Sequence, residues 1–284
     1  MKKLLTTLFA LLLTAGLTAC TSAPAASQAS QPDESSTSSA PSQKPEENVE
    51  LTVFAAASLT ETLDEISKAY SEQHPGVQFT FNFDSSGTLQ TQIEEGAECD
   101  LFLSAAQKQM DALEKGGFID PDTRIDLLEN KVVLAVPKGN PAGIKTFADI
   151  GTDKCSLIAL GNDDVPVGAY SIEILTSLGL LEGLENSQKI TYGSNVKEVT
   201  TQVSEGVVDC GIVYATDAFS AGLEVAETAD PSLCSQVLYP AAVLKGSSHA
   251  KAASEFLAYL QGDEARTIFE KVGFTVIDAE SAAK

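Results

Sequence analysis

The chain has 284 residues, and its 40 acidic against 18 basic side chains give a formal net charge of −22 at pH 7. This balance argues against nucleic acid as a partner, because phosphate backbones are bound by clustered positive charge. Residues 49–284 are numerous enough for one large α/β domain or for two smaller lobes.

The N-terminus carries an export signal. Lys2 and Lys3 precede a hydrophobic run over residues 4–13, which is too short for a membrane-spanning helix. Residues 17–20, Leu-Thr-Ala-Cys, resemble the lipobox of bacterial lipoproteins. The sequence therefore predicts a signal peptide over residues 1–19 and a lipid on Cys20, which would anchor the exported protein to the outer face of the cell membrane.

A linker is expected between the lipid anchor and the folded part. Residues 20–48 contain mostly Ser, Ala, Pro, Gln and Thr with scattered acidic residues. Such a composition cannot bury enough apolar surface to fold. We therefore expect a flexible tether.

From residue 49 onward the sequence alternates between strand and helix patterns. A short apolar strand is expected over residues 51–55, and it leads into a helix with a 3.6-residue apolar period. Ser58 stands at the start of this helix with Glu61 three residues later, which is the spacing of a capping box. The apolar face of this helix contains Leu59, Leu63, Ile66 and Tyr70.

The rest of the chain repeats this alternation. A helix is expected over residues 107–115, and Asn195 with Glu198 again has capping-box spacing. Further strands are expected over residues 77–83, 99–103, 131–137, 156–160, 210–214 and 239–244. Two closing helices follow, the first burying Ala253, Phe256, Leu257 and Leu260, the second Ile268 and Phe269.

Alternating βα units predict an α/β fold with mostly parallel sheets, in which ligands bind where strands end and helices begin. The junctions carry hydroxyl or apolar residues without charge at neutral pH. Backbone N–H groups at helix starts, together with hydroxyls, suit a small and fully ionised oxyanion. Each hydrogen bond to a charged group contributes about 1.5–3 kcal/mol, so several must converge to offset desolvation. The candidate residues are Ser58, Ser86, Val167, Val196 and Tyr214.

Acidic residues beside these junctions leave one alternative open. Asp84 and the pair Asp163-Asp164 could accept the proton of a ligand such as hydrogen phosphate, or they could be ordinary turn and capping residues. The cysteines also leave alternatives open, because four thiols allow three disulfide pairings and lack the short paired spacings of a zinc site. These four are Cys99, Cys155, Cys210 and Cys234.

An enzyme is the alternative from another class. An anchored acyl-transfer enzyme could use Ser58 or Ser86 as nucleophile, but such a serine needs a base. The two histidines, His74 and His249, lie in a turn and a polar loop away from both serines in the pattern. No metal-ligand spacing, P-loop or G-x-S-x-G elbow occurs, so we expect a binding protein with no catalytic residues, no direct metal ligands and no cofactor.

Five segments carry a family resemblance: residues 52–59 (TVFAAASL), 84–89 (DSSGTL), 100–105 (DLFLSA), 165–168 (VPVG) and 211–214 (GIVY). Taken in order, they resemble the molybdate-binding proteins of bacterial ABC importers. The resemblance covers residues 50–277 and implies a two-lobed periplasmic-binding-protein fold, type II-like, with the ligand in the cleft between the lobes. Lobe 1 would comprise residues 49–129 plus 238–284, and lobe 2 residues 130–237.

The resemblance also implies how the ligand is held and delivered. Ser58 and Ser86 would bind through hydroxyl and backbone, Val167 and Val196 through backbone N–H, and Tyr214 through its hydroxyl. The family often has Ala where Val167 stands, an exchange that keeps the backbone donor. The implied protein is a monomer that captures molybdate, and tungstate of nearly the same charge and shape, for the permease of an ABC importer. A receptor for sulfate or phosphate is the alternative among binding proteins.

Overall fold

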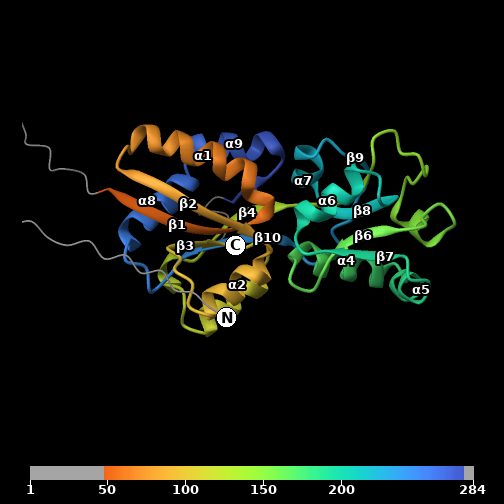
Figure 1. The fold of residues 1–284 in the computed structure, drawn as a ribbon, viewed down its shortest axis with the longest axis horizontal. Coiled ribbons are helices and arrows are strands. Elements are labelled where there is room, and N and C mark those ends of the chain that lie inside the picture. The colour runs from red at the N-terminus through yellow and green to blue at the C-terminus, as the bar shows by residue number, and fades with distance from the viewer. Residues whose placement is uncertain (1–47, 278–284) are drawn as a thin grey trace, which may run out of the picture. The chain divides into compact units, whose positions relative to one another are not determined.

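The computed structural model describes residues 48–277. The expected signal peptide, Cys20 and all of the expected linker except Asn48 lie outside this part of the chain. In the described part, helices and strands alternate and the strands form two separate sheets (Figure 1). None of the helices in residues 48–277 is both long and apolar enough to cross a membrane.

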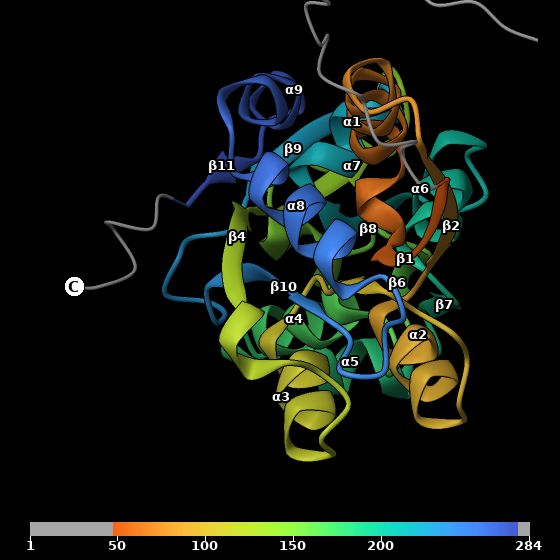
Figure 2. The same cartoon turned by 90° about the vertical axis from the view of Figure 1, so that its left-hand side faces the viewer.

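Lobe 1 is built on the six-stranded sheet, in the order β11-β4-β10-β3-β1-β2. Helices α1, α8 and α9 lie on one face of this sheet, and α2 and α3 lie on the other (Figure 2). The strands are β1 (Val49–Ala56), β2 (Val77–Asp84), β3 (Leu101–Leu103), β4 (Ile125–Asn130), β10 (Val237–Val243) and β11 (Thr275–Val276). The helices are α1 (Thr60–Gln73), α2 (Ser86–Glu94), α3 (Gln107–Lys115), α8 (Ala250–Leu260) and α9 (Asp263–Val272), with short 3₁₀ turns η1 (Ala57–Leu59) and η2 (Pro121–Thr123).

Lobe 2 is built on the five-stranded sheet, in the order β7-β6-β8-β5-β9. Its strands are β5 (Val132–Val136), β6 (Ile158–Gly161), β7 (Ile190–Gly193), β8 (Cys210–Tyr214) and β9 (Glu224–Thr228). Its helices are α4 (Pro166–Ser177), α5 (Leu181–Asn186), α6 (Val196–Ser204) and α7 (Ala215–Ser220), with the 3₁₀ turn η3 (Phe147–Gly151).

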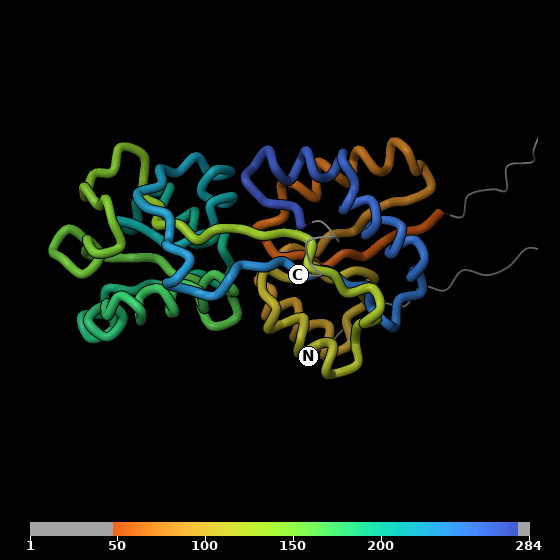
Figure 3. Tube along the Cα trace, turned by 180° about the vertical axis from the view of Figure 1, so that it is seen from behind, coloured from red at the N-terminus to blue at the C-terminus, as the bar shows by residue number. Residues whose placement is uncertain are grey.

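The chain passes between the lobes twice. It crosses first at Lys131, between β4 and β5, and returns through residues 229–236, between β9 and β10. Both crossings run side by side in the trace (Figure 3).

The crossings make both sheets mixed. β1 pairs in parallel with β2 and β3, and β6 with β7 and β8. The crossing strands β4, β5, β9 and β10 pair antiparallel with their neighbours. The expected parallel arrangement therefore holds for the βα units alone, because a strand that enters from the other lobe is not constrained by a crossover helix.

The helical periods predict the core correctly. Leu59, Leu63 and Ile66 are fully buried, and Tyr70 stacks edge-on against Phe256 of α8 with ring centroids 5.1 Å apart. The predicted face of α8 is buried as well, as is Phe269 of α9, whereas Ile268 is only partly buried. Burying one such Leu or Phe side chain contributes about 1.5–3 kcal/mol, so this shared apolar face is what holds α1 and α8 on the sheet.

The predicted capping box at Ser58 is wrong. α1 begins at Thr60, and its N-cap Leu59 makes no side-chain cap. Ser58 lies one turn earlier, in η1, where its hydroxyl bonds Tyr239 instead. At Asn195 half of the predicted box forms: the Asn195 side chain accepts from the Glu198 N–H at 3.1 Å, but the Glu198 carboxylate accepts from Ser194.

Candidate functional site

The predicted junctions converge on one cavity between the lobes. Ser58 and Ser86 of lobe 1 line it together with Val196 and Tyr214 of lobe 2. Val167 does not line the cavity; its neighbours Val165 and Pro166 do, at the start of α4. Four of the five predicted residues therefore lie around one space, and the fifth lies one residue behind it.

The cavity is small. Its volume is about 10 Å³, which is room for about one water molecule. The lobes are therefore closed tightly over the space, and a larger ligand requires them to stand slightly further apart.

Helix starts from both lobes supply the backbone donors. Ser86 and Val196 are the first residues of α2 and α6, and Val167 is the second residue of α4. N–H groups in the first turn of a helix have no partner within the helix and lie at the positive end of its dipole. The side chain of Ser85 caps α2 by accepting from the Thr88 N–H at 3.1 Å, which leaves Ser86 free to face the cavity.

A buried hydrogen-bond network orients the hydroxyl of Ser58. Its oxygen lies 2.9 Å from the Tyr239 hydroxyl, which also accepts from the Asn130 amide at 3.2 Å. Asn130 donates as well to the Thr216 hydroxyl at 2.9 Å. Asn130 and Tyr239 stand on β4 and β10, next to the crossings. Sequence reasoning missed both, because the local sequence around an Asn or a Tyr in an apolar strand does not indicate its hydrogen-bond partners.

Ala105 connects the two remaining hydroxyls. The Ser86 hydroxyl accepts from the Ala105 N–H at 3.0 Å, so its own proton can point elsewhere. The Tyr214 hydroxyl donates to the Ala105 carbonyl at 3.4 Å, from the opposite lobe. Burial raises the pKa of Tyr214 and of Tyr239 well above the usual value of 10. Both phenols therefore remain protonated donors throughout the physiological range.

Close backbone contacts hold the lobes together beside the cavity. The Gly87 N–H donates to the Asp164 carbonyl at 2.9 Å, from α2 to the loop before α4. A Cβ on Gly87 would lie 2.6 Å from that carbonyl oxygen, so only glycine permits this approach. Asp84 lines the cavity, but its Oδ1 accepts from the Ser85 N–H at 2.7 Å and lies 3.4 Å from the Asn195 amide nitrogen across the cleft.

A charged cluster spans the cleft next to Val196. The Lys197 ammonium lies 2.7 Å from Glu61 of α1 in lobe 1 and 3.1 Å from Asp217 of α7 in lobe 2. The contact with Asp217 is an ion pair without hydrogen-bond alignment. Burial raises the pKa of Asp217 to about 6, against the opposing effect of Lys197. Burial alone would lower the pKa of Lys197, but Asp217 and Glu61 raise it above its usual value.

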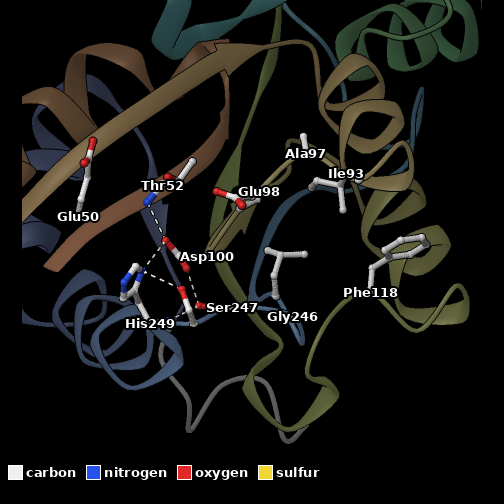
Figure 4. Close-up of a pocket in the computed structure, with 14 residues that line it drawn as sticks. Glu50, Thr52, Ile93, Ala97, Glu98, Asp100, Phe118, Gly246, Ser247 and His249 are labelled. Carbon is white, nitrogen blue, oxygen red and sulfur yellow. Dashed lines mark hydrogen bonds and ion pairs between the residues drawn. The ribbon is translucent and has the colours of Figure 1, made fainter.

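The histidines do not serve the predicted serines. His74 stacks on Tyr70 with ring centroids 4.1 Å apart. His249 lies in a separate pocket of about 580 Å³ in lobe 1 (Figure 4), where its Nδ1 is 3.5 Å from Asp100. The Ser247 hydroxyl there donates to Asp100 at 2.6 Å, so it is not activated by the imidazole. Within residues 48–277, no cluster of His, Cys, Asp and Glu could hold a metal ion.

Comparison with known proteins decides the family. The family model for bacterial extracellular solute-binding proteins matches residues 51–275. The chain belongs to this family. The family is one of solute-binding proteins, and the named relatives are binding proteins as well, so the acyl-transfer alternative is wrong.

The similar proteins are all described as binding proteins. YvgL of Bacillus subtilis, whose name describes an ABC transporter substrate-binding lipoprotein, is 40% identical over 81% of this chain and 88% of its own. The molybdate-binding protein ModA of Escherichia coli is 38% identical over 80% of this chain and 89% of its own. The periplasmic molybdate-binding protein of Azotobacter vinelandii, 24% identical, covers 80% of this chain and all of its own with a TM-score of 0.73. The resemblance found in the sequence and the two-lobed binding-protein fold are thereby confirmed.

Proposed function

We propose that this protein captures molybdate outside the cytoplasm and delivers it to the permease of an ABC importer. The observation that carries the proposal is the meeting of helix starts and hydroxyls from both lobes around one small cavity. The 38% identity to a molybdate-binding protein supports the same ligand. The bound anion is cargo, and no cofactor takes part.

The proposed contacts come from both lobes. Ser58 and Ser86 bind through hydroxyl and N–H, and Val167 and Val196 through backbone N–H. Tyr214 binds through its hydroxyl, whose single proton turns to the anion from the Ala105 carbonyl, 3.4 Å away. Four of these five residues line the cavity. Val167 follows Pro166, which has no N–H, and therefore offers the first N–H of α4. Each hydrogen bond to the anion contributes about 1.5–3 kcal/mol, and the helix dipoles add to this sum.

Selectivity follows from a site with many donors and few free acceptors. Tungstate has nearly the charge and shape of molybdate and is accepted, whereas sulfate is smaller and reaches fewer donors at once. Hydrogen phosphate brings a proton that needs an acceptor, at a cost of about 1–3 kcal/mol if none is available. The one carboxylate that lines the cavity, Asp84, has its Oδ1 engaged by Ser85 and Asn195.

The proposal includes a lipid anchor on Cys20 and a monomeric receptor. The name of the Bacillus subtilis relative, a lipoprotein, supports the anchor. Replacing Cys20 by Ser should release the protein from membranes, which fractionation of cells expressing both forms would detect. An equal membrane fraction for both forms would contradict the anchor.

Calorimetry of the protein starting at residue 49 tests the ligand. Molybdate and tungstate should bind tightly, and sulfate, phosphate and chromate should bind weakly or not at all. Tight phosphate binding that is abolished by Asp84→Asn would show instead a phosphate receptor with an acceptor in its site. Tight sulfate binding without molybdate binding would favour the sulfate receptor.

A further inference from the structure

Two buried thiols of lobe 2 lie next to each other. The Sγ atoms of Cys155 and Cys210 are 3.8 Å apart, and both side chains are fully buried. Cys210 begins β8, while Cys155 lies in the segment between η3 and β6. β6 pairs in parallel with β8, and Ile158 stands opposite Cys210. The fold thus brings together two cysteines from distant parts of the sequence.

Hydrogen bonds hold the segment of Cys155 against the start of β8. The carboxylate of Asp209, the residue before Cys210, accepts from the N–H groups of Ser156 at 2.6 Å and Leu157 at 3.1 Å. The Lys189 ammonium donates to the Cys155 carbonyl at 2.8 Å from the other side. These contacts flank the two thiols and keep Cys155 beside Cys210 without a bond between them.

We infer that Cys155 and Cys210 form a disulfide in the exported protein. The two sulfurs are already in van der Waals contact, so a disulfide of about 2.05 Å needs only a further approach of the side chains. Cys155 precedes a regular strand, and its backbone can supply part of that approach. Extracellular solute-binding proteins work in a compartment where disulfides form and persist.

The other two cysteines do not compete for this pairing. Cys99 is in lobe 1, where its thiol donates to the Leu101 carbonyl at 3.3 Å. Cys234 lies in the returning crossing and is partly exposed. The geometry therefore selects a single bridge and leaves Cys99 and Cys234 as thiols.

The oxidant is a disulfide of a thiol oxidase, and the bond forms by exchange while lobe 2 is folding, because both thiols are buried in the folded protein. The Cys155 thiolate attacks one sulfur of that disulfide and releases the other as a thiolate, which leaves a mixed disulfide on Cys155. The Cys210 thiolate then attacks the Cys155 sulfur and releases the second oxidant thiolate. The two cysteines lose two protons and two electrons, and the oxidant becomes a dithiol.

The bridge closes a loop that contains α4 and α6, the helices of Val167 and Val196. It contacts none of the cavity-lining residues, because it lies at the opposite end of β8 from Tyr214. We therefore expect it to stabilise lobe 2 and to leave anion affinity unchanged. The inference stands independently of the ligand.

Alkylation and mass spectrometry of the full-length protein exported by cells test the pairing. The protein is denatured with iodoacetamide and no reductant, then digested. A linked peptide pair containing Cys155 and Cys210, two hydrogens lighter than the separate peptides, is expected, with Cys99 and Cys234 alkylated. The same protein treated with dithiothreitol first provides the control. Alkylation of Cys155 and Cys210 without reductant, or a link from either to Cys99 or Cys234, would overturn the inference.

Thermal unfolding gives a second readout. Dithiothreitol should lower the melting temperature of the wild type on the order of 5–10 °C and leave the Cys155→Ala/Cys210→Ala double variant unchanged. Cys99→Ala, which removes a buried thiol outside the pair, should retain the full response to reductant. A wild type that melts at the same temperature with and without reductant would contradict the bridge.

Discussion

The ion pair between Glu61 and Lys197 joins the lobes only when they are closed. Glu61 belongs to α1 and Lys197 to α6, and both Glu61 oxygens lie within 2.8 Å of the ammonium. When the lobes part, Lys197 keeps Asp217 of its own lobe and loses Glu61. Replacing Glu61 by Gln should therefore weaken molybdate binding by making the closed state less stable and the anion faster to dissociate.

The size of the expected loss of affinity depends on how far the two side chains are exposed to water. The Glu61 side chain is 49% exposed and that of Lys197 is 30% exposed, so water screens the pair and its contribution is about 0.2–1 kcal/mol. This corresponds to a loss of affinity of at most about fivefold. In about 1 M NaCl, where the Debye length falls to about 3 Å, the difference between wild type and variant should shrink further.

Glu65→Gln is the matched control. Glu65 stands one turn further along α1, is 52% exposed and pairs at 3.1 Å with Lys271 of the same lobe. Both variants lose one carboxylate from the same helix, but only Glu61→Gln loses a contact between the lobes. Dissociation rates from stopped-flow chases with tungstate, together with calorimetric affinities, would separate them. Equal dissociation constants for the two variants at low salt would refute the role of this pair in closure.

Three further outcomes are expected of the site. Ser58→Ala and Ser86→Ala should each weaken molybdate binding by about 1.5–3 kcal/mol in calorimetry, one hydrogen bond to a charged group apiece; losses below the calorimetric error would remove these hydroxyls from the site. Gly87→Ala should cost about 1–3 kcal/mol of binding in calorimetry, because its Cβ meets the Asp164 carbonyl at 2.6 Å when the lobes are closed; undiminished affinity would mean that the lobes do not close this far on the anion. Molybdate affinity should be constant from about pH 7 to 9, since hydroxyls and amides do not titrate there and burial keeps Tyr214 protonated. A steep loss of affinity across that range would show that a titrating side chain contacts the anion.

Local patterns predicted what depends on neighbours in sequence. The bounds of α3 and β8 agree with the expected residues 107–115 and 210–214. The apolar spacing and the residues that end these elements lie within or next to each element in the sequence, so they can be recognised without the fold. The same reasoning found the helix starts of α2 and α6, where small residues meet a capping side chain. It could therefore indicate where donors gather.

Contacts between segments that are distant in the sequence could not be predicted from local patterns. Ser58 was expected to cap α1, but the Tyr239 hydroxyl on β10 competes for its oxygen. The sequence pattern does not indicate that Lys197 and Asp217 pair, and only the fold shows that the Asp217 side chain is fully buried. Whether a Lys, Asp or Tyr faces solvent or a partner depends on how sheets and lobes pack, and the local period does not contain that information.

Asp217 stabilises the folded state at low pH, whereas most carboxylates stabilise it at higher pH. Its pKa rises from 3.8 in the unfolded chain to about 6 in the folded one, so the folded state binds more protons between these values. Its contribution is therefore full below about pH 4 and is lost as the pH rises through about 6, a change of about 3 kcal/mol. Asp217→Asn keeps the size of the side chain and removes the titration.

Urea unfolding of the wild type and of Asp217→Asn at several pH values measures this contribution directly, because the other carboxylates cancel in the difference. The free energy of unfolding of the wild type minus that of the variant should fall by about 3 kcal/mol from pH 4 to pH 7. Glu198, whose pKa is lowered by the Ser194 N–H, provides the contrasting case: the corresponding difference for Glu198→Gln should rise over the same range. A constant difference for Asp217→Asn would mean that Lys197 fully offsets the burial of the carboxylate, and that the charged cluster beside Val196 holds the same protons folded and unfolded.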